Sequence, residues 1–118
     1  EEAKETIKLN FEKYNYLLDP HTAVGVKSLN KYRQKSDDST IAVVDSTASP
    51  YKFSRAVLES LKDKKIDKDE YRIIEELEEI SSTELHRGLK DLENMASRHD
   101  HSCSKDEVKE KIAEILDI

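Results

Sequence analysis

The apolar residues of this chain recur at intervals of three and four over most of its length, which is the spacing of one helix face. The first stripe, within residues 2–16, predicts a helix that buries Ala3, Ile7, Phe11 and Tyr14. The second predicts a helix from Pro20 to about Lys35 that buries Ala23, Val26, Leu29 and Tyr32. The third predicts a helix from Pro50 to about Lys62 that buries Phe53, Val57 and Leu61.

The second half of the chain shows helical stripes alone. These stripes consist of Ile73, Ile74, Leu77 and Ile80, of Leu85, Leu89, Leu92 and Ala96, and of Val108, Ile112, Ile115 and Leu116. Ser104 and Glu107 stand in capping-box register before the last stripe, which predicts a helix start there. We interpret the stripes as contacts between helices and assign them no cofactor role.

One segment, at about residues 40–46, departs from the helical pattern. Ile41 to Val44 form a short, continuous apolar run rich in β-branched residues, which is typical of a strand buried on both faces. The predicted fold class is therefore α/β, mainly helical with one strand. Because the strand's backbone groups need hydrogen-bonding partners, we expect neighbours from sequence outside this chain, from a second copy, or from an edge arrangement. Self-association through residues 41–44 is one of these expectations.

The two prolines of the chain follow residues that cap helices well. Asp19 precedes Pro20 and Ser49 precedes Pro50. Asp and Ser accept hydrogen bonds from the open N–H groups of a first helical turn, and proline fits that turn because its missing N–H is not needed there. Both stretches are therefore predicted helix starts.

Composition limits the classes of function. Asp and Glu number 26 against 20 Lys and Arg, for a net charge of −6. This balance and the absence of a basic stripe argue against nucleic-acid binding. No apolar run has membrane-spanning length and no signal-peptide pattern is present. A single cysteine suits a reducing compartment, so we expect a cytoplasmic protein. Because the sequence begins with Glu-Glu and not with Met, we expect a fragment of a longer chain.

Two regions hold side chains that could carry chemistry. His99, His101 and Cys103 alternate in a polar segment, but no fourth zinc ligand is evident, and no metal site is predicted. A Cys–His nucleophile would need an orienting group and an oxyanion site that the sequence does not show. At the end of the predicted strand, Asp45, Ser46, Thr47 and Ser49 occupy the position where ligands bind in open α/β sheets. Such residues also serve simply to cap the following helix.

Two motifs in this order resemble the C-terminal part of threonine synthases. In that family, a helix start of the type DPHTAVG is followed by a strand and then by a turn of the type STAHPAKF. Residues 19–25 match the first motif consecutively. The second motif is matched by Ser46, Thr47, Ala48, Pro50, Lys52 and Phe53. The resemblance covers about residues 1–62, and the rest of the chain matches only in being helical.

The resemblance implies a fold and a chemistry. The fold is the tryptophan-synthase-like fold of enzymes that depend on pyridoxal phosphate. The implied activity is that of a carbon–oxygen lyase, converting O-phosphohomoserine and water to threonine and phosphate. In the family, the threonine that matches Thr47 hydrogen-bonds the pyridine nitrogen of the cofactor. A neutral hydroxyl leaves that nitrogen largely unprotonated, which suits elimination and replacement at the β and γ carbons.

This chain differs from the family pattern in several respects. Ser49 stands where the family has histidine, and Asp45 stands where an apolar residue is usual. The Schiff-base lysine of the family lies upstream in a Phe-Lys-Asp motif that is absent here, and two glycines cannot form its glycine-rich phosphate loop. Lys52 lies in the wrong motif to be that lysine. No catalytic residue is therefore assigned, and the isolated chain is expected to be inactive and not to bind pyridoxal phosphate.

Two interpretations remain open. In the first, residues 1–66 complete the cofactor-binding α/β domain of a longer threonine synthase, residues 67–118 form a helical extension, and the rest of the enzyme is the partner. In the second, the chain is a stand-alone helical interaction domain without catalytic activity. An upstream Phe-Lys-Asp motif and a glycine-rich loop in the parent gene would favour the first.

Overall fold

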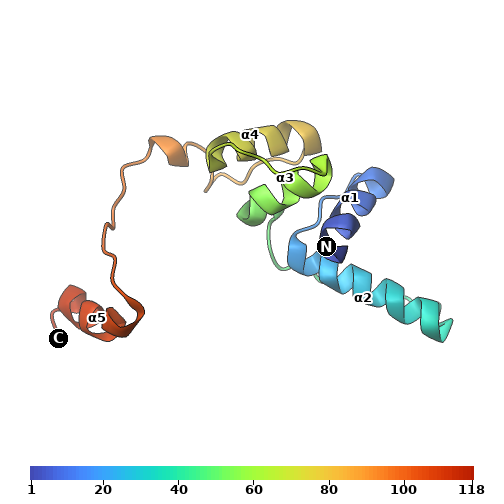
Figure 1. The fold of residues 1–118 in the computed structure, drawn as a ribbon, viewed down its shortest axis with the longest axis horizontal. Coiled ribbons are helices and arrows are strands. Elements are labelled where there is room, and N and C mark those ends of the chain that lie inside the picture. The colour runs from blue at the N-terminus through green and yellow to red at the C-terminus, as the bar shows by residue number, and fades with distance from the viewer.

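The computed structural model describes all residues, 1–118, and the fold is helical (Figure 1). The α-helices are α1 (Glu2–Tyr14), α2 (Pro20–Ser36), α3 (Ser54–Lys62), α4 (Glu70–Ser81) and α5 (Val108–Leu116). Short 3-10 turns occupy Pro50–Phe53, Leu92–Asn94 and Lys105–Glu107. The three helices predicted from the stripes in residues 2–62 are thus confirmed, the third with a 3-10 first turn.

The core lies where α1 packs on α2 and α3, and where α4 packs on α3. Its largest fully buried apolar side chains are Ile7, Val57, Leu58, Ile73 and Leu77, which come largely from the predicted stripes. Tyr14 and Tyr32 were expected to face inward, but they are 63% and 54% exposed. That expectation was wrong because both lie toward the C-terminal ends of their helices, beyond the packed part of the bundle.

The predicted strand at about residues 40–46 is not found. Residues 37–47 carry no regular secondary structure, and Ile41 and Val43 are 92% and 85% exposed. The expectation of a buried strand was wrong for this chain because the chain supplies no second strand to satisfy the backbone hydrogen bonds. The tryptophan-synthase-like arrangement of strands is therefore not seen, and the observed fold class is all-helical.

The helix predicted from the stripe at residues 85–96 is also wrong. The region holds a turn and the 3-10 turn Leu92–Asn94 instead. Glycine disfavours a helix interior, and the Gly88 N–H donates to Nδ1 of His86 at 3.1 Å, a local bond that competes with helix formation. Asp91 then adopts a left-handed backbone with φ of 60°. Only Leu85 of this stripe is buried in the core.

The C-terminal helix α5 stands apart from the bundle. Figure 1 shows it at the end of a long irregular segment, away from α1–α4. The predicted capping box at its start is confirmed, because Glu107 Oε2 accepts from Ser104 N at 3.0 Å and from Ser104 Oγ at 2.7 Å. The apolar face of α5 lies in solvent, with Ile112 50% and Leu116 59% exposed.

Two further observations concern the organisation of the chain. None of its helices combines the length and the apolar character needed to cross a membrane. The core passes across the predicted domain boundary at residue 66, since Ile73 and Leu77 of α4 belong to the same cluster as Val57 and Leu58 of α3. The division into 1–66 and 67–118 stays a prediction.

Candidate functional site

The N-terminus of α2 is built around a buried carboxylate. Asp19 is 0% exposed, and its Oδ1 accepts from the backbone N–H groups of His21 at 2.9 Å and Thr22 at 3.4 Å. Its Oδ2 accepts from the hydroxyl of Thr22. Pro20 occupies the first helical position, as predicted. Burial alone would raise the pKa of Asp19, but the hydrogen bonds from Thr22 and His21 outweigh it and hold the pKa below its ordinary value.

Two side-chain contacts join this helix start to the second motif, 24 or more residues along the chain. The Oγ atoms of Thr22 and Ser46 lie 3.3 Å apart. The rings of His21 and Phe53 pack with their centroids 4.9 Å apart and their planes inclined by 60°. The structure thus brings the two motifs together as neighbours, which their separate positions in the sequence did not require.

Gly25 allows the segment before Ser46 to approach α2. A Cβ at Gly25 would lie 3.3 Å from Cγ1 of Val44, which is tighter than ordinary van der Waals contact. Arg33 Nη2 also donates to the carbonyl of Thr40 at 2.7 Å. The segment predicted as a strand therefore lies alongside α2 and leads to the second motif.

Thr47 lies at the end of this segment with its side chain in solvent. It is exposed, and its hydroxyl takes part in no hydrogen bond within the chain. Asp45 is exposed as well, whereas Ser49 is half-buried and its Oγ accepts from the N–H of Tyr51 at 3.3 Å. Ser49 therefore caps the following turn as predicted, although the family pattern has histidine there. Thr47 remains available to an external hydrogen-bonding group.

Tyr51 fixes the second motif to the C-terminal end of α4, a role that the sequence analysis missed. Its ring is 4% exposed, and its hydroxyl donates to the carbonyl of Thr83. Burial raises the pKa of Tyr51 above its ordinary value. The only sequence signal was an aromatic residue two positions after the predicted cap, Ser49. Lys52, beside it, is exposed.

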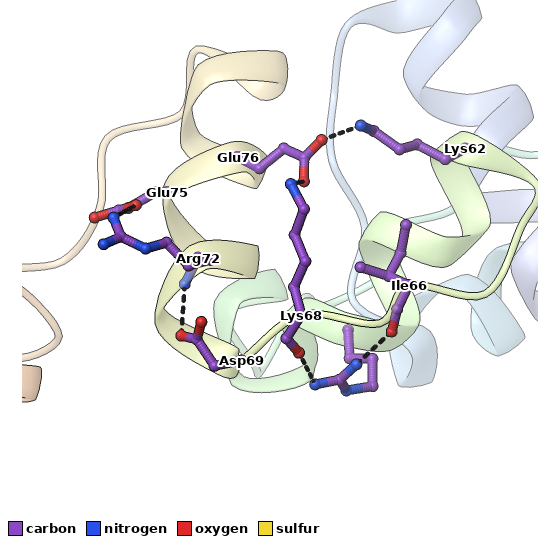
Figure 2. A network of polar contacts seen from close by, with 8 residues as sticks. Lys62, Ile66, Lys68, Asp69, Arg72, Glu75 and Glu76 are labelled. Carbon is purple, nitrogen blue, oxygen red and sulfur yellow. Dashed lines mark hydrogen bonds and ion pairs between the residues drawn. The ribbon is translucent and has the colours of Figure 1, made fainter.

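A charged network joins α3, the connector that follows it and α4 (Figure 2). Glu76 accepts from Lys62 and, at 2.9 Å, from Lys68; these two hydrogen bonds lower the pKa of Glu76 to about 2. The guanidinium of Arg55 donates to the carbonyls of Ile66 at 2.6 Å and Lys68 at 2.7 Å. These groups are partnered with one another, so the network stabilises the connection between the helices and offers no site for a ligand.

The alternating His99, His101 and Cys103 are not assembled into a metal centre. All three are exposed in an irregular segment, and no group of three His, Cys, Asp or Glu side chains lies close enough to hold a metal ion. The larger surface clefts do not include Thr47 either; the largest is lined mainly by charged side chains of α1 and the end of α3. The junction of the two motifs is thus the candidate site.

Comparison with known proteins shows the family of the chain. The family described as "Threonine synthase, C-terminal" matches residues 22–112. The chain belongs to this family. It is 36% identical over 123 residues to a threonine synthase of Saccharomyces cerevisiae, a match that covers 98% of this chain and 22% of the relative. It is 41% identical over 58 residues to a threonine synthase of Schizosaccharomyces pombe, covering 48% of this chain and 11% of the relative.

The resemblance noted from the two motifs is thereby confirmed. It also extends further than predicted, because the family match continues to residue 112, through the irregular segment and into α5. The chain spans only about a fifth of the length of the Saccharomyces cerevisiae relative.

Proposed function

We propose that this chain is the C-terminal part of a longer, pyridoxal-phosphate-dependent threonine synthase that converts O-phosphohomoserine and water to threonine and phosphate. The observation that supports this most directly is the family match over residues 22–112, together with the contact between the two motifs at Thr22 and Ser46. The rest of the enzyme is the proposed partner, and O-phosphohomoserine the proposed substrate.

The residues of the junction fit one part of the cofactor. Thr47 offers an exposed hydroxyl that no group of this chain engages, and a hydroxyl can hydrogen-bond a neutral pyridine nitrogen. When bound, the cofactor supplies the electron sink for bond breaking next to the amino-acid carbon. The role of Thr47 is to orient the ring and to leave its nitrogen largely unprotonated. Ser49 is engaged in capping, since its Oγ accepts from the N–H of Tyr51.

The same junction does not fit the remaining parts of the cofactor. Gly25 lies inside α2 and Gly88 in a distant turn, so the chain holds no glycine-rich phosphate loop. Lys52 is exposed and lies outside any Phe-Lys-Asp motif. We therefore propose that this chain alone binds pyridoxal phosphate neither specifically nor stoichiometrically, and that it has no activity by itself.

Titration of the isolated chain with pyridoxal phosphate, followed by desalting, tests this proposal. The expected result is that no protein-bound absorption band remains, since scattered reaction with surface lysines is reversible. A stable band at one cofactor per chain would contradict it. The full-length enzyme, treated in the same way, is the matched control and retains its band.

The proposed role of Thr47 is tested by turnover of the full-length enzyme. Thr47→Val keeps the shape of the side chain but removes the donor, and a buried group that loses its partner costs about 1–3 kcal/mol. If this loss falls on the transition state, phosphate release slows about tenfold to a hundredfold. Thr47→Ser keeps a hydroxyl and should retain much more activity. Turnover of the Val variant at the parental rate would contradict a catalytic role for the Thr47 hydroxyl.

We further propose that residues 41–44 pair with a strand from the rest of the enzyme. Ile41 and Val43 are almost fully exposed here, and an apolar segment of this kind buries its side chains and backbone groups when it joins a sheet. Mixing this chain with the separately produced N-terminal part should give a complex that Ile41→Asp weakens. If sedimentation instead shows a dimer of this chain and no complex with the N-terminal part, the result would support self-association through the same segment.

A further inference from the structure

We infer that Asp19 is a positioning residue for Thr47 and that it acts through the hydroxyls of Thr22 and Ser46. The inference rests on the proposed function, because it assigns a purpose to the orientation of Thr47. It deepens that function by connecting the buried carboxylate of the first motif to the residue proposed to contact the cofactor in the second.

The hydroxyl of Thr22 lies within reach of two acceptors, Oδ2 of Asp19 and, at 3.3 Å, Oγ of Ser46. Asp19 is fully buried, and its carboxylate can only accept. The single hydroxyl of Thr22 therefore connects the buried carboxylate of the first motif to Ser46 of the second.

This hydroxyl relay, Ser46–Thr22–Asp19, holds the last part of the segment at residues 37–47. The segment has no regular secondary structure in this chain; Arg33 holds its start through the carbonyl of Thr40, and the relay holds its end. Ser46 directly precedes Thr47, and its bond to Thr22 anchors one side of that residue. Ser49, which caps the turn at Tyr51, anchors the other. Thr47 lies between the two anchors with its own hydroxyl free.

The position of the relay explains why a carboxylate is buried at this helix start. An aspartate cap functions equally well in solvent, as Asp69 shows at the start of α4, where it is exposed and accepts from Tyr71 N at 3.0 Å and Arg72 N at 3.1 Å. Asp19 contacts two side chains in addition to the backbone, the Thr22 hydroxyl and, at 3.3 Å, Nδ1 of His21, and the first of these contacts leads to Ser46. Capping alone requires neither.

The relay is tested in the full-length enzyme by variants that break it at different points. Thr22→Val keeps the shape and removes both of its hydroxyl contacts, and Thr22→Ser restores them. Ser46→Ala breaks only the end next to Thr47 and leaves the Asp19 cap intact. Ser39→Ala, a substitution of the same kind in the same exposed segment, is the control.

Two readouts separate positioning from simple stability. In Thr22→Val and Ser46→Ala, the affinity of the enzyme for pyridoxal phosphate should fall about threefold to tenfold, and the absorption maximum of the bound cofactor should shift. Thr22→Ser and Ser39→Ala should behave like the parent in both measurements.

The outcomes distinguish this inference from the proposed function. If Thr47→Val shifts the absorption maximum but Ser46→Ala and Thr22→Val do not, the relay is refuted and the role of Thr47 stands. If Thr47→Val leaves the spectrum unchanged, the proposed contact of Thr47 is refuted and the relay has no positioning role. Parental affinity for pyridoxal phosphate in Thr22→Val also refutes the relay.

Discussion

Replacement of Asp19 with alanine removes a helix cap and a buried hydrogen-bond acceptor at once. The cap accepts from two backbone N–H groups, and loss of such a cap costs typically about 1 kcal/mol. The hydroxyl of Thr22 also loses its charged acceptor in a position where Thr22 is only 6% exposed. A hydrogen bond to a charged group contributes about 1.5–3 kcal/mol. Together these effects predict that Asp19→Ala lowers the free energy of unfolding by about 2–4 kcal/mol.

Asp69→Ala is the matched control for this substitution. Asp69 caps α4 through two backbone N–H groups, as Asp19 caps α2, but it is exposed and accepts from no hydroxyl. Its removal should therefore cost only the cap, about 1 kcal/mol. Asp19→Asn should fall between the two alanine variants, because one carboxylate oxygen is kept as an acceptor while the other becomes a donor that cannot accept from Thr22.

Urea unfolding followed by circular dichroism at 222 nm measures the difference. With a slope of about 1–3 kcal/mol per molar urea for a small protein, Asp19→Ala should shift the midpoint by about 1 M or more, and well beyond Asp69→Ala. Equal midpoints for the two alanine variants would refute the reasoning, because they would show that the buried contact to Thr22 adds nothing to capping.

Two further substitutions follow from the structure. Gly25→Ala should raise the free energy of unfolding by about 0.5–1 kcal/mol, because alanine favours a helix interior more than glycine does. The Val44 side chain would lie 3.3 Å from the new Cβ, but it belongs to an irregular segment that can move away. Thermal unfolding checks this prediction, and a destabilised variant would show that Val44 is held in place. Glu76→Gln should be less stable than the parent above pH 4.5, and the difference in stability should shrink as the pH falls toward 2. The reason is that Lys62 and Lys68 lower the pKa of Glu76 from 4.5 to about 2. The stabilising effect of Glu76 is lost once its carboxylate is protonated in the folded state. A difference that is independent of pH between 2 and 7 would contradict the second prediction.

The sequence predicted the local features whose causes lie within a few residues. Asp19 and Ser49 cap helical segments as expected, with proline at the first helical position in both cases. The capping box of Ser104 and Glu107 was likewise predicted. The stripe positions Ile73 and Leu77 became core because an amphipathic face must be buried against another helix.

Features that depend on distant partners could not be predicted in the same way. The apolar run at residues 41–44 has strand composition, but whether it forms a strand depends on a neighbour that this chain does not contain. The stripe from Leu85 fails as a helix because His86 and Gly88 bond locally, which apolar periodicity does not register. The contact between Thr22 and Ser46 joins residues 24 positions apart, and neither motif alone indicates it.

The apolar spacing of α5 predicted a helix but not the surface that covers it. The apolar residues of α5 have clear helical spacing, and the helix forms, yet its apolar face remains exposed. Periodicity establishes which side of a helix is apolar but does not establish what covers it. In the longer enzyme proposed here, surfaces outside this chain are available to cover both α5 and residues 41–44.

We propose above all that Thr47 contacts the cofactor of the full-length threonine synthase. The most direct test is a crystal structure of the full-length enzyme with pyridoxal phosphate bound, in which the distance from Thr47 Oγ1 to the pyridine nitrogen is measured. We predict a hydrogen-bond distance of about 2.7–3.2 Å, with Ser46 Oγ still within hydrogen-bonding reach of Thr22. A separation well beyond about 3.5 Å, or another side chain bonded to that nitrogen, would contradict the account.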